Sequence, residues 1–187
     1  MGNPLSPGIT IGTCSWMEKE WLQLLPEINK ESFKAARYMD DIFLMRKSQE
    51  PWDKELFEKE CYWPPLRLEA AQQDTFLETK FSISQEGLRY WIKNDNEEST
   101  KVWRYHHFES DISLSQKQTT LIAVLRKVHK MSTEGPILYR SAVNKLKEFI
   151  RLKYPLKLCK MACSVVARET GSIIWMSVRR FLYQFYN

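Results

Sequence analysis

The feature that most constrains the fold is a pair of adjacent carboxylates, Asp40 and Asp41, set between two short apolar runs. Residues 33–37 and 42–45 are predicted to form two strands joined by a turn at residues 38–41. The second run is apolar at every position, as expected of a strand covered on both faces. The pattern therefore predicts an antiparallel hairpin with two carboxylates at its tip.

Two like charges side by side on a buried hairpin are costly unless something offsets them. A divalent cation does this, and Mg²⁺ prefers carboxylate and phosphate oxygens. The alternative is a solvated Asp-Asp turn without metal, because Asp is common in turns. The apolar flanking runs and the aromatic Tyr38 before the pair favour the metal-binding hypothesis.

A helix is predicted before this hairpin, over residues 8–25. Its apolar residues recur at intervals of three or four, and Pro26 ends the pattern. The positions that form this stripe are Ile11, Cys14, Met17, Trp21 and Leu25. We expect the stripe to pack against the hairpin.

Three further elements are predicted after the hairpin. Residues 51–61 form a charged helix with Pro51 in its first turn, and residues 66–70 form a short strand. Residues 76–93 alternate between apolar and polar side chains on either side of a turn at residues 85–87, which predicts a second hairpin.

The rest of the chain is predicted to be helical. Ser115 and Gln118 form a capping-box pattern at the start of one helix, and Gly135-Pro136 separates it from the next. Gly171 precedes a terminal helix. The fold class is therefore α+β, with an antiparallel sheet and helices in residues 1–100 and a helical bundle in residues 101–187.

Composition narrows the class of protein only in part. Lys and Arg total 28 against 23 Asp and Glu, a net charge of +5 that suits a phosphate-rich partner but also many other proteins. Four cysteines without a CxxC pair indicate reduced thiols in an intracellular protein, nuclear or cytoplasmic. Cys159 and Cys163 are interpreted as buried thiols rather than metal ligands.

The C-terminal stretch, residues 172–187, is apolar and aromatic. It is shorter than the ~20 residues that a membrane span requires, and Arg179 and Arg180 interrupt it. We expect a terminal packing helix and no stable membrane insertion. An interfacial membrane anchor is the alternative.

Four short segments resemble motifs of reverse transcriptases, and they occur in the order of that family. Residues 37–43, Arg-Tyr-Met-Asp-Asp-Ile-Phe, resemble the Tyr-x-Asp-Asp motif called motif C. Residues 2–8, Gly-Asn-Pro-Leu-Ser-Pro-Gly, resemble motif B, which leads into a helix. Residues 66–70 resemble motif D, and residues 76–78, Phe-Leu-Glu, resemble motif E. The resemblance is greatest to Penelope-like retroelements, in which Asp is usual where this chain has Glu78.

The resemblance implies an RNA-directed DNA polymerase acting by two-metal nucleotidyl transfer. Residues 1–100 would be part of the palm, and residues 101–187 a thumb-like region. Asp40 and Asp41 would bind the catalytic Mg²⁺, and Tyr38 and Met39 would lie near the primer terminus or the incoming nucleotide. The floor under the template and nucleotide would be shaped by Gly2, Pro4 and Ser6.

The implied partners are an RNA template, a DNA primer and a deoxynucleoside triphosphate. A thumb grips the backbone of the duplex, so basic side chains on its helices are candidates for phosphate contacts. The candidates are Lys117, Arg126, Lys127 and Lys130. The alternative is an ordinary solvated helix face. Nothing in the sequence indicates an oligomeric state.

The family takes a third catalytic carboxylate from motif A, which lies before motif B. This sequence begins at motif B, so we expect a C-terminal palm-and-thumb fragment with little or no activity alone. One alternative is a degenerate or domesticated remnant that binds nucleic acid without catalysis. Another is a host protein in which Tyr-Met-Asp-Asp is coincidental, and a hairpin not packed on helix 8–25 would support that alternative.

Overall fold

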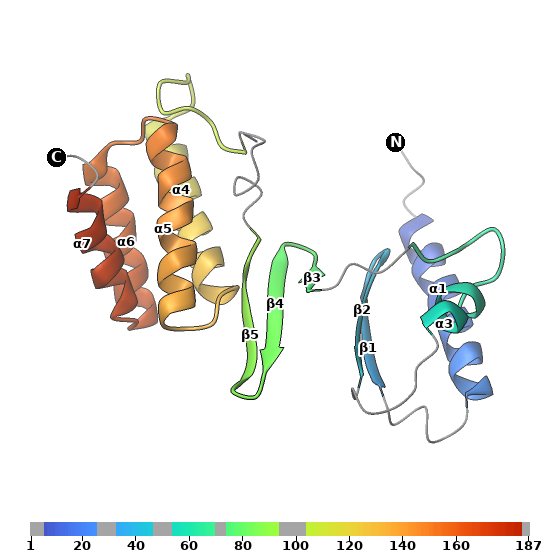
Figure 1. Ribbon diagram of the computed structural model, residues 1–187. Coiled ribbons are helices and arrows are strands. Elements are labelled where there is room, and N and C mark those ends of the chain that lie inside the picture. The colour runs from blue at the N-terminus through green and yellow to red at the C-terminus, as the bar shows by residue number, and fades with distance from the viewer. Residues whose placement is uncertain (1–5, 26–32, 47–53, 70–73, 94–103, 185–187) are drawn as a thin grey trace. The chain divides into compact units, whose positions relative to one another are not determined.

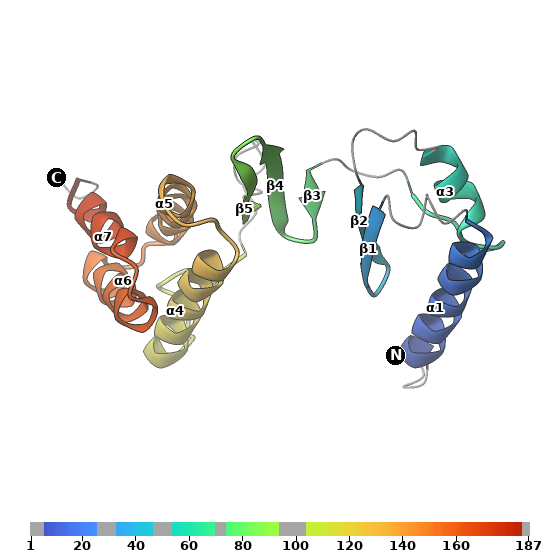
Figure 2. The same cartoon turned by 90° about the horizontal axis from the view of Figure 1, so that it is seen from below.

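The structure is a computed structural model, and it describes residues 6–25, 33–46, 54–69, 74–93 and 104–184. The described residues form six helices together with small antiparallel sheets, so the α+β class is confirmed (Figures 1 and 2). The chain divides into two compact units, Met1–Leu77 and Glu78–Asn187. This division falls ahead of the second hairpin, whereas the predicted boundary lay after residue 100.

The first unit contains helices α1 and α3 and the hairpin that carries the carboxylates. Its elements are α1 (Ser6–Leu24), β1 (Phe33–Tyr38), β2 (Asp41–Arg46), α3 (Lys54–Glu60) and β3 (Thr75–Phe76). The predicted first helix and first hairpin are thus confirmed. The predicted helix over residues 51–61 is confirmed where it is described.

A small apolar cluster joins α1 and α3 of the first unit. Trp21 of α1 packs edge-on against Phe57 of α3, with ring centroids 5.1 Å apart. Trp21, Cys61 and Tyr62 are buried, and Ile42 of β2 packs against them. Ile11, which the sequence placed on the same stripe, is exposed. Helix α1 therefore buries only the C-terminal part of its apolar stripe among the described residues.

Two predictions for this unit are wrong. Strand β2 is not covered on both faces, because Phe43 is only half-buried and Met45 is exposed. The sheet that contains β2 has two strands, which is too narrow to form a closed layer. The predicted strand at residues 66–70 is not extended into a sheet where it is described. Its first residue instead donates a turn hydrogen bond from Leu66 N to Trp63 O, at 3.0 Å.

The described residues of the second unit form a hairpin and four helices. Its elements are β4 (Thr79–Ser84), β5 (Gly87–Ile92), α4 (Leu114–Lys130), α5 (Pro136–Arg151), α6 (Leu156–Thr170) and α7 (Ile174–Gln184). The strands pair antiparallel from Thr79 opposite Ile92 to Ser84 opposite Gly87, as the alternating pattern predicted. The predicted helical bundle is also confirmed.

The helix ends follow local chemistry. Gly135 precedes Pro136 at a φ of 90°, and Gly171 closes α6 at a φ of 69°, a region that favours glycine. The predicted cap at Ser115 is wrong by two residues. Ser113 caps α4 instead, and its hydroxyl accepts from Gln116 N at 3.3 Å. The Ser-x-x-Gln pattern occurs twice in succession, and the chain uses the earlier copy.

The four helices enclose the larger core. Helix α6 packs on α4 and α7, and α5 packs on α4, α7 and strand β5. The fully buried side chains include Leu121, Leu125, Leu146, Phe149 and Trp175. Each buried side chain of this kind stabilises the fold by about 1.5–3 kcal/mol relative to exposure. The second unit is therefore held mainly by apolar packing.

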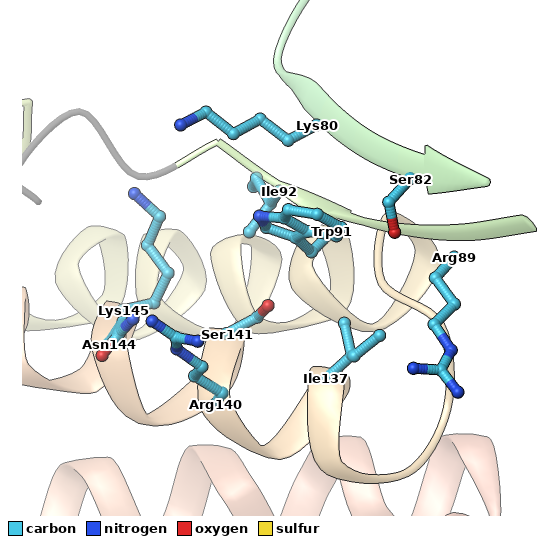
Figure 3. A pocket seen from close by; sticks show the side chains of 10 residues that line it. All are labelled: Lys80, Ser82, Arg89, Trp91, Ile92, Ile137, Arg140, Ser141, Asn144 and Lys145. Carbon is cyan, nitrogen blue, oxygen red and sulfur yellow. The ribbon is translucent and has the colours of Figure 1, made fainter. Parts of the chain in front are cut away.

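The second hairpin is fixed to the helices by specific contacts. Tyr90 N donates to Thr133 Oγ1 at 2.9 Å, and Thr133 N donates back to Tyr90 O at 2.8 Å. Ile92 is buried in the helical core, and Glu78 forms an ion pair with Lys127 of α4. Strand β5 consequently lies along α5 (Figure 3).

Two cysteines of α6 are part of this core, as predicted. Cys159 and Cys163 are fully buried. Burial raises the pKa of Cys159 to about 11 and that of Cys163 to about 12. Cys61 of the first unit is likewise buried, and burial raises its pKa to about 12. In contrast, Cys14 is only half-buried.

These environments predict unequal thiol reactivity. At pH 8, a thiol with a pKa near 12 is ionised in only ~1 molecule in 10,000, and the thiolate is the nucleophile. We expect an aromatic disulfide reagent to label Cys14 first in the folded protein, and the other three only after unfolding in denaturant. Mass spectrometry of the labelled peptides checks this. Rapid native labelling of Cys159 or Cys163 would contradict the packing of α6.

Candidate active site

The carboxylate pair lies at a tight two-residue turn. Tyr38 pairs with Asp41 across the hairpin, which leaves Met39 and Asp40 as the turn residues. Met39 has a φ of 55°, in the left-handed region that costs a residue with a side chain about 1–3 kcal/mol. Two-residue hairpins usually place Gly, Asn or Asp in such a position. Met39 therefore adopts this turn conformation at an energetic cost.

The turn is open to solvent, so the expected burial of the two carboxylates is wrong. Tyr38 is 58% exposed and Met39 is 59% exposed, and both carboxylates are exposed as well. Burial of two like charges is therefore not a reason to require a cation here. The exposed oxygens are instead accessible to a cation or a substrate from outside the unit.

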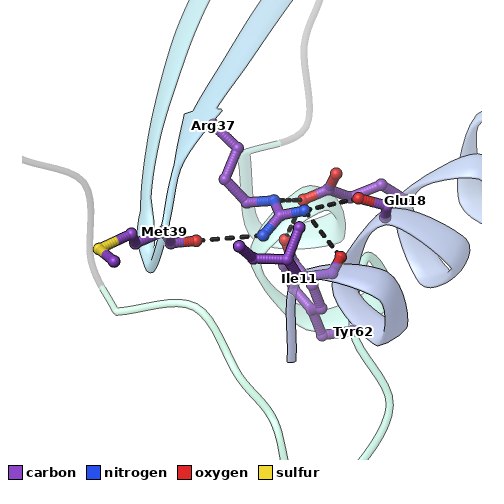
Figure 4. Close-up of polar contacts among 6 residues, drawn as sticks. Ile11, Glu18, Arg37, Met39 and Tyr62 are labelled. Carbon is purple, nitrogen blue, oxygen red and sulfur yellow. Dashed lines mark hydrogen bonds and ion pairs between the residues drawn. The ribbon is translucent and has the colours of Figure 1, made fainter. Parts of the chain in front are cut away.

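Arg37 holds the turn against helix α1 (Figure 4). Its Nη1 donates to Met39 O at 3.1 Å, and its Nη2 donates to Ile11 O at 3.1 Å and to Ser15 Oγ at 2.7 Å. Its Nε lies 2.8 Å from Glu18 Oε1 as an ion pair, without the alignment of a hydrogen bond. One guanidinium thus contacts both the turn and the helix.

Glu18 connects this contact to the small core. It accepts a short hydrogen bond from the hydroxyl of Tyr62, which is buried beside Trp21. Burial, followed by the bond to Glu18, raises the pKa of Tyr62 well above its usual value. The path runs from the turn through Arg37 and Glu18 to the buried tyrosine.

Sequence reasoning did not assign a role to Arg37, Glu18 or Tyr62. Arg37 stands next to the motif, so its position was a weak signal. The sequence gave no signal for the contact between Glu18 and Tyr62, which are far apart in the chain. Their contact depends on the packing of α3 and the following turn on α1. Such long-range polar contacts have no local pattern.

The carboxylates match part of a metal site. Asp40 and Asp41 are adjacent, and no group of three or more His, Cys, Asp or Glu side chains able to hold a metal occurs among the described residues. Mg²⁺ requires six oxygen ligands and commonly keeps several waters. The pair could therefore supply two carboxylate ligands, and the other ligands would have to come from water, substrate or further chain.

The predicted floor residues are described only at one position. Gly2 and Pro4 lie outside the described residues. Ser6 is the first residue of α1, is exposed, and accepts a hydrogen bond from Thr10 Oγ1 at its carbonyl, at 2.9 Å. Nothing in the described part brings Ser6 to the carboxylate turn.

The four predicted phosphate contacts have different environments. Lys117 is buried, and its Nζ donates to Ser110 O at 2.6 Å over the ring of Phe108. Lys117 therefore stabilises the fold and is not a surface cation, because its ammonium group is bound to groups inside the protein.

The other three cations are exposed on α4. Arg126 pairs with Glu169 of α6, its Nε donating to Oε2 at 2.8 Å, and this lowers the pKa of that carboxyl. Lys127 pairs with Glu78, which lowers the pKa of Glu78. Lys130 has no partner among the residues that the structure describes, so it is the most available of the four.

Comparison of the chain with known protein families, with curated proteins and with solved structures finds no match. Within the described ranges, no helix combines the length and the apolar character needed to cross a membrane. The interpretation of the site therefore depends on its geometry and on the resemblance of its motifs.

The Arg37 contacts predict a specific response to substitution. Arg37→Lys keeps the positive charge near Glu18 but cannot donate to Met39, Ile11 and Ser15 together. We expect a loss of about 1–3 kcal/mol in local stability, because several hydrogen bonds to a charged group are lost at once. Amide hydrogen exchange of β1 and β2 measures this loss.

The matched control is Arg67→Lys, because Arg67 is an exposed arginine of the same unit. Surface replacements of this kind usually change stability by less than ~0.5 kcal/mol. Equal hydrogen exchange in the two variants would show that Arg37 does not hold the turn.

Proposed function

We propose that the chain is a palm-and-thumb part of an RNA-directed DNA polymerase of a retroelement, most similar to the Penelope-like group. The observation that carries the proposal is the Tyr-Met-Asp-Asp turn of a hairpin tied to the preceding helix by Arg37. A coincidental motif would not require the turn to be fastened to that helix. The packing of Ile42 against the cluster around Trp21 supports the same interpretation.

In the proposed reaction, the 3′-hydroxyl of a primer attacks the α-phosphate of a deoxynucleoside triphosphate and releases pyrophosphate. Asp40 and Asp41 would hold Mg²⁺, which when bound stabilises the charge on the attacking and leaving oxygens. The exposed Tyr38 and Met39 would lie beneath the primer terminus or the nucleotide. Arg37 is a positioning residue, because it sets the turn through its backbone and does not reach the reacting atoms.

The proposed partners are an RNA template, a DNA primer and the nucleotide, in the nucleus or cytoplasm. Among the candidate thumb contacts, Lys130 is exposed and without a partner in the described part of the chain, so it is the best placed to reach a phosphate. Arg126 and Lys127 would first have to leave Glu169 and Glu78. Phosphate contacts of this kind weaken as salt is added.

A second candidate function is nucleic-acid binding without catalysis, as in a degenerate or domesticated remnant. The observation that favours it is that the carboxylate turn lies in no larger group of metal-ligating side chains within the described residues. The two functions differ in their dependence on Asp40 and Asp41. Catalysis requires both carboxylates, whereas binding to the backbone of a duplex does not.

Primer extension tests the catalytic part. With Mg²⁺, an RNA template and a labelled DNA primer, we expect the 187-residue polypeptide to add no more nucleotide than its Asp40→Asn/Asp41→Asn variant. The reason is that the described residues place only these two carboxylates at the turn, and two carboxylates hold a metal pair weakly. If the unaltered chain incorporates nucleotide and the double substitution abolishes this activity, the prediction of an incomplete site is contradicted and the chain is a polymerase.

Binding of an RNA–DNA duplex tests the nucleic-acid part. We expect fluorescence anisotropy to show an affinity that falls with salt, and Lys130→Gln to lower the slope of log K against log salt by about one. Lys157→Gln is the matched control, because it removes an exposed lysine of α6. Salt-independent binding, or an equal effect of both substitutions, would count against the assigned contact.

A further inference from the structure

The second unit contains a cavity between its hairpin and helix α5 that the proposed reaction does not use. The cavity is about 320 Å³, near the lower end of the ~300–1,000 Å³ typical of small-molecule sites. Its walls come from β4, β5 and α5, as Figure 3 shows. Its size suits one small ligand and not a duplex.

The charged side chains among the described residues that line the cavity are all basic. They are Lys80, Arg89, Arg140 and Lys145. Lys145 is buried and paired with Glu148, with Nζ 3.0 Å from Oε1, and Arg89 is paired with Glu86.

Two of the four cations are not neutralised in this way. No ion pair between described residues includes Lys80 or Arg140. Two uncompensated positive charges beside one cavity match a phosphate monoester, which carries a charge of about −1.5 to −2 near neutral pH. Arginine also binds phosphate through two parallel N–H donors.

An aromatic surface lies in the same cavity. Figure 3 places the ring of Trp91 between the hairpin and α5, with Arg140 and Ser141 on the helix below it. Trp91 is half-buried, so part of its ring is accessible to a ligand. Its neighbour in the strand, Ile92, is buried in the core. A planar ring stacked on an indole gains about 1–3 kcal/mol. The lining therefore offers a stacking surface beside phosphate-binding groups.

The walls of the cavity are held in place without a ligand. The two hydrogen bonds between Tyr90 and Thr133 fix β5 to the loop before α5, and Ile92 anchors the strand in the core. The opposite wall is α5, which packs on α4 and α7, and the ion pair with Glu148 of the same helix orients the side chain of Lys145. A preformed site loses less free energy on binding than one that must be ordered.

We propose that this cavity binds a small aromatic phosphate monoester of mononucleotide size, with the phosphate at Lys80 and Arg140 and the ring on Trp91. The proposal is independent of the polymerase function, because every lining residue belongs to the second unit and Asp40 and Asp41 take no part. Two sources share this chemistry, a nucleoside monophosphate and a simple aryl phosphate.

Isothermal titration calorimetry of the full chain tests the proposal, with AMP, phenyl phosphate, adenosine and inorganic phosphate as probes. EDTA is present throughout, so that no divalent ion can bind at the carboxylate turn. We expect saturable binding of AMP, and at least a tenfold weaker affinity for adenosine and for inorganic phosphate. Equal affinity for phenyl phosphate and AMP would show that the cavity accepts aryl phosphates in general. A clear preference for AMP would show that the ligand is a nucleotide.

Three substitutions locate the site. Arg140→Gln and Trp91→Leu should each weaken AMP binding about tenfold or more, while Arg151→Gln, an exposed arginine of the same helix, should not. Arg140 is exposed, so its replacement keeps the test valid if Trp91→Leu unfolds the hairpin. Absence of saturable AMP binding, full affinity in Arg140→Gln, or equal binding of inorganic phosphate would overturn the proposal. Unchanged AMP binding in the Asp40→Asn/Asp41→Asn variant would show that the cavity binds its ligand independently of the polymerase site.

Discussion

The guanidinium of Arg37 is the contact on which the geometry of the first unit depends. It reaches the carbonyl of Met39 in the turn and the side chains of Ser15 and Glu18 on helix α1. A typical hydrogen bond adds about 0.5–1.5 kcal/mol in net stability, and one to a charged group about 1.5–3 kcal/mol. The larger effect of the Arg37 contacts is on position, because one planar group with fixed donor directions sets a hairpin tip against a helix.

The two units are held by different forces, and the difference bears on what each can do. The first unit buries few apolar side chains among its described residues and leaves its carboxylate turn exposed. The second unit is built on a continuous apolar core, from which β5 and α5 hold the basic cavity in shape. Functional loops generally lie in the less stable parts of a fold. The exposed turn is accessible to ligands from solvent, and the cavity has the rigid walls of a preformed binding site.

Periodicity was enough to predict most of the local elements but not their environments. The stripe ending at Trp21 predicted helix α1, and alternation predicted the β4–β5 hairpin, because both patterns are local. Burial and pairing depend on contacts distant in sequence. For this reason the prediction that β2 is buried on both faces was wrong. Lys117 was likewise predicted to be a surface cation, although it donates a hydrogen bond to Ser110 O inside the fold. Contacts of Arg37 with Glu18 were likewise beyond any sequence pattern.

The central claim is that the exposed pair Asp40 and Asp41 is part of a divalent-cation site. Amide NMR during a titration with Mn²⁺, which takes the same oxygen ligands as Mg²⁺, tests it most directly. The account predicts paramagnetic broadening centred on residues 38–42 that disappears in Asp40→Asn/Asp41→Asn. Broadening that persists in the double variant, or none at the turn in the unaltered chain, would contradict it.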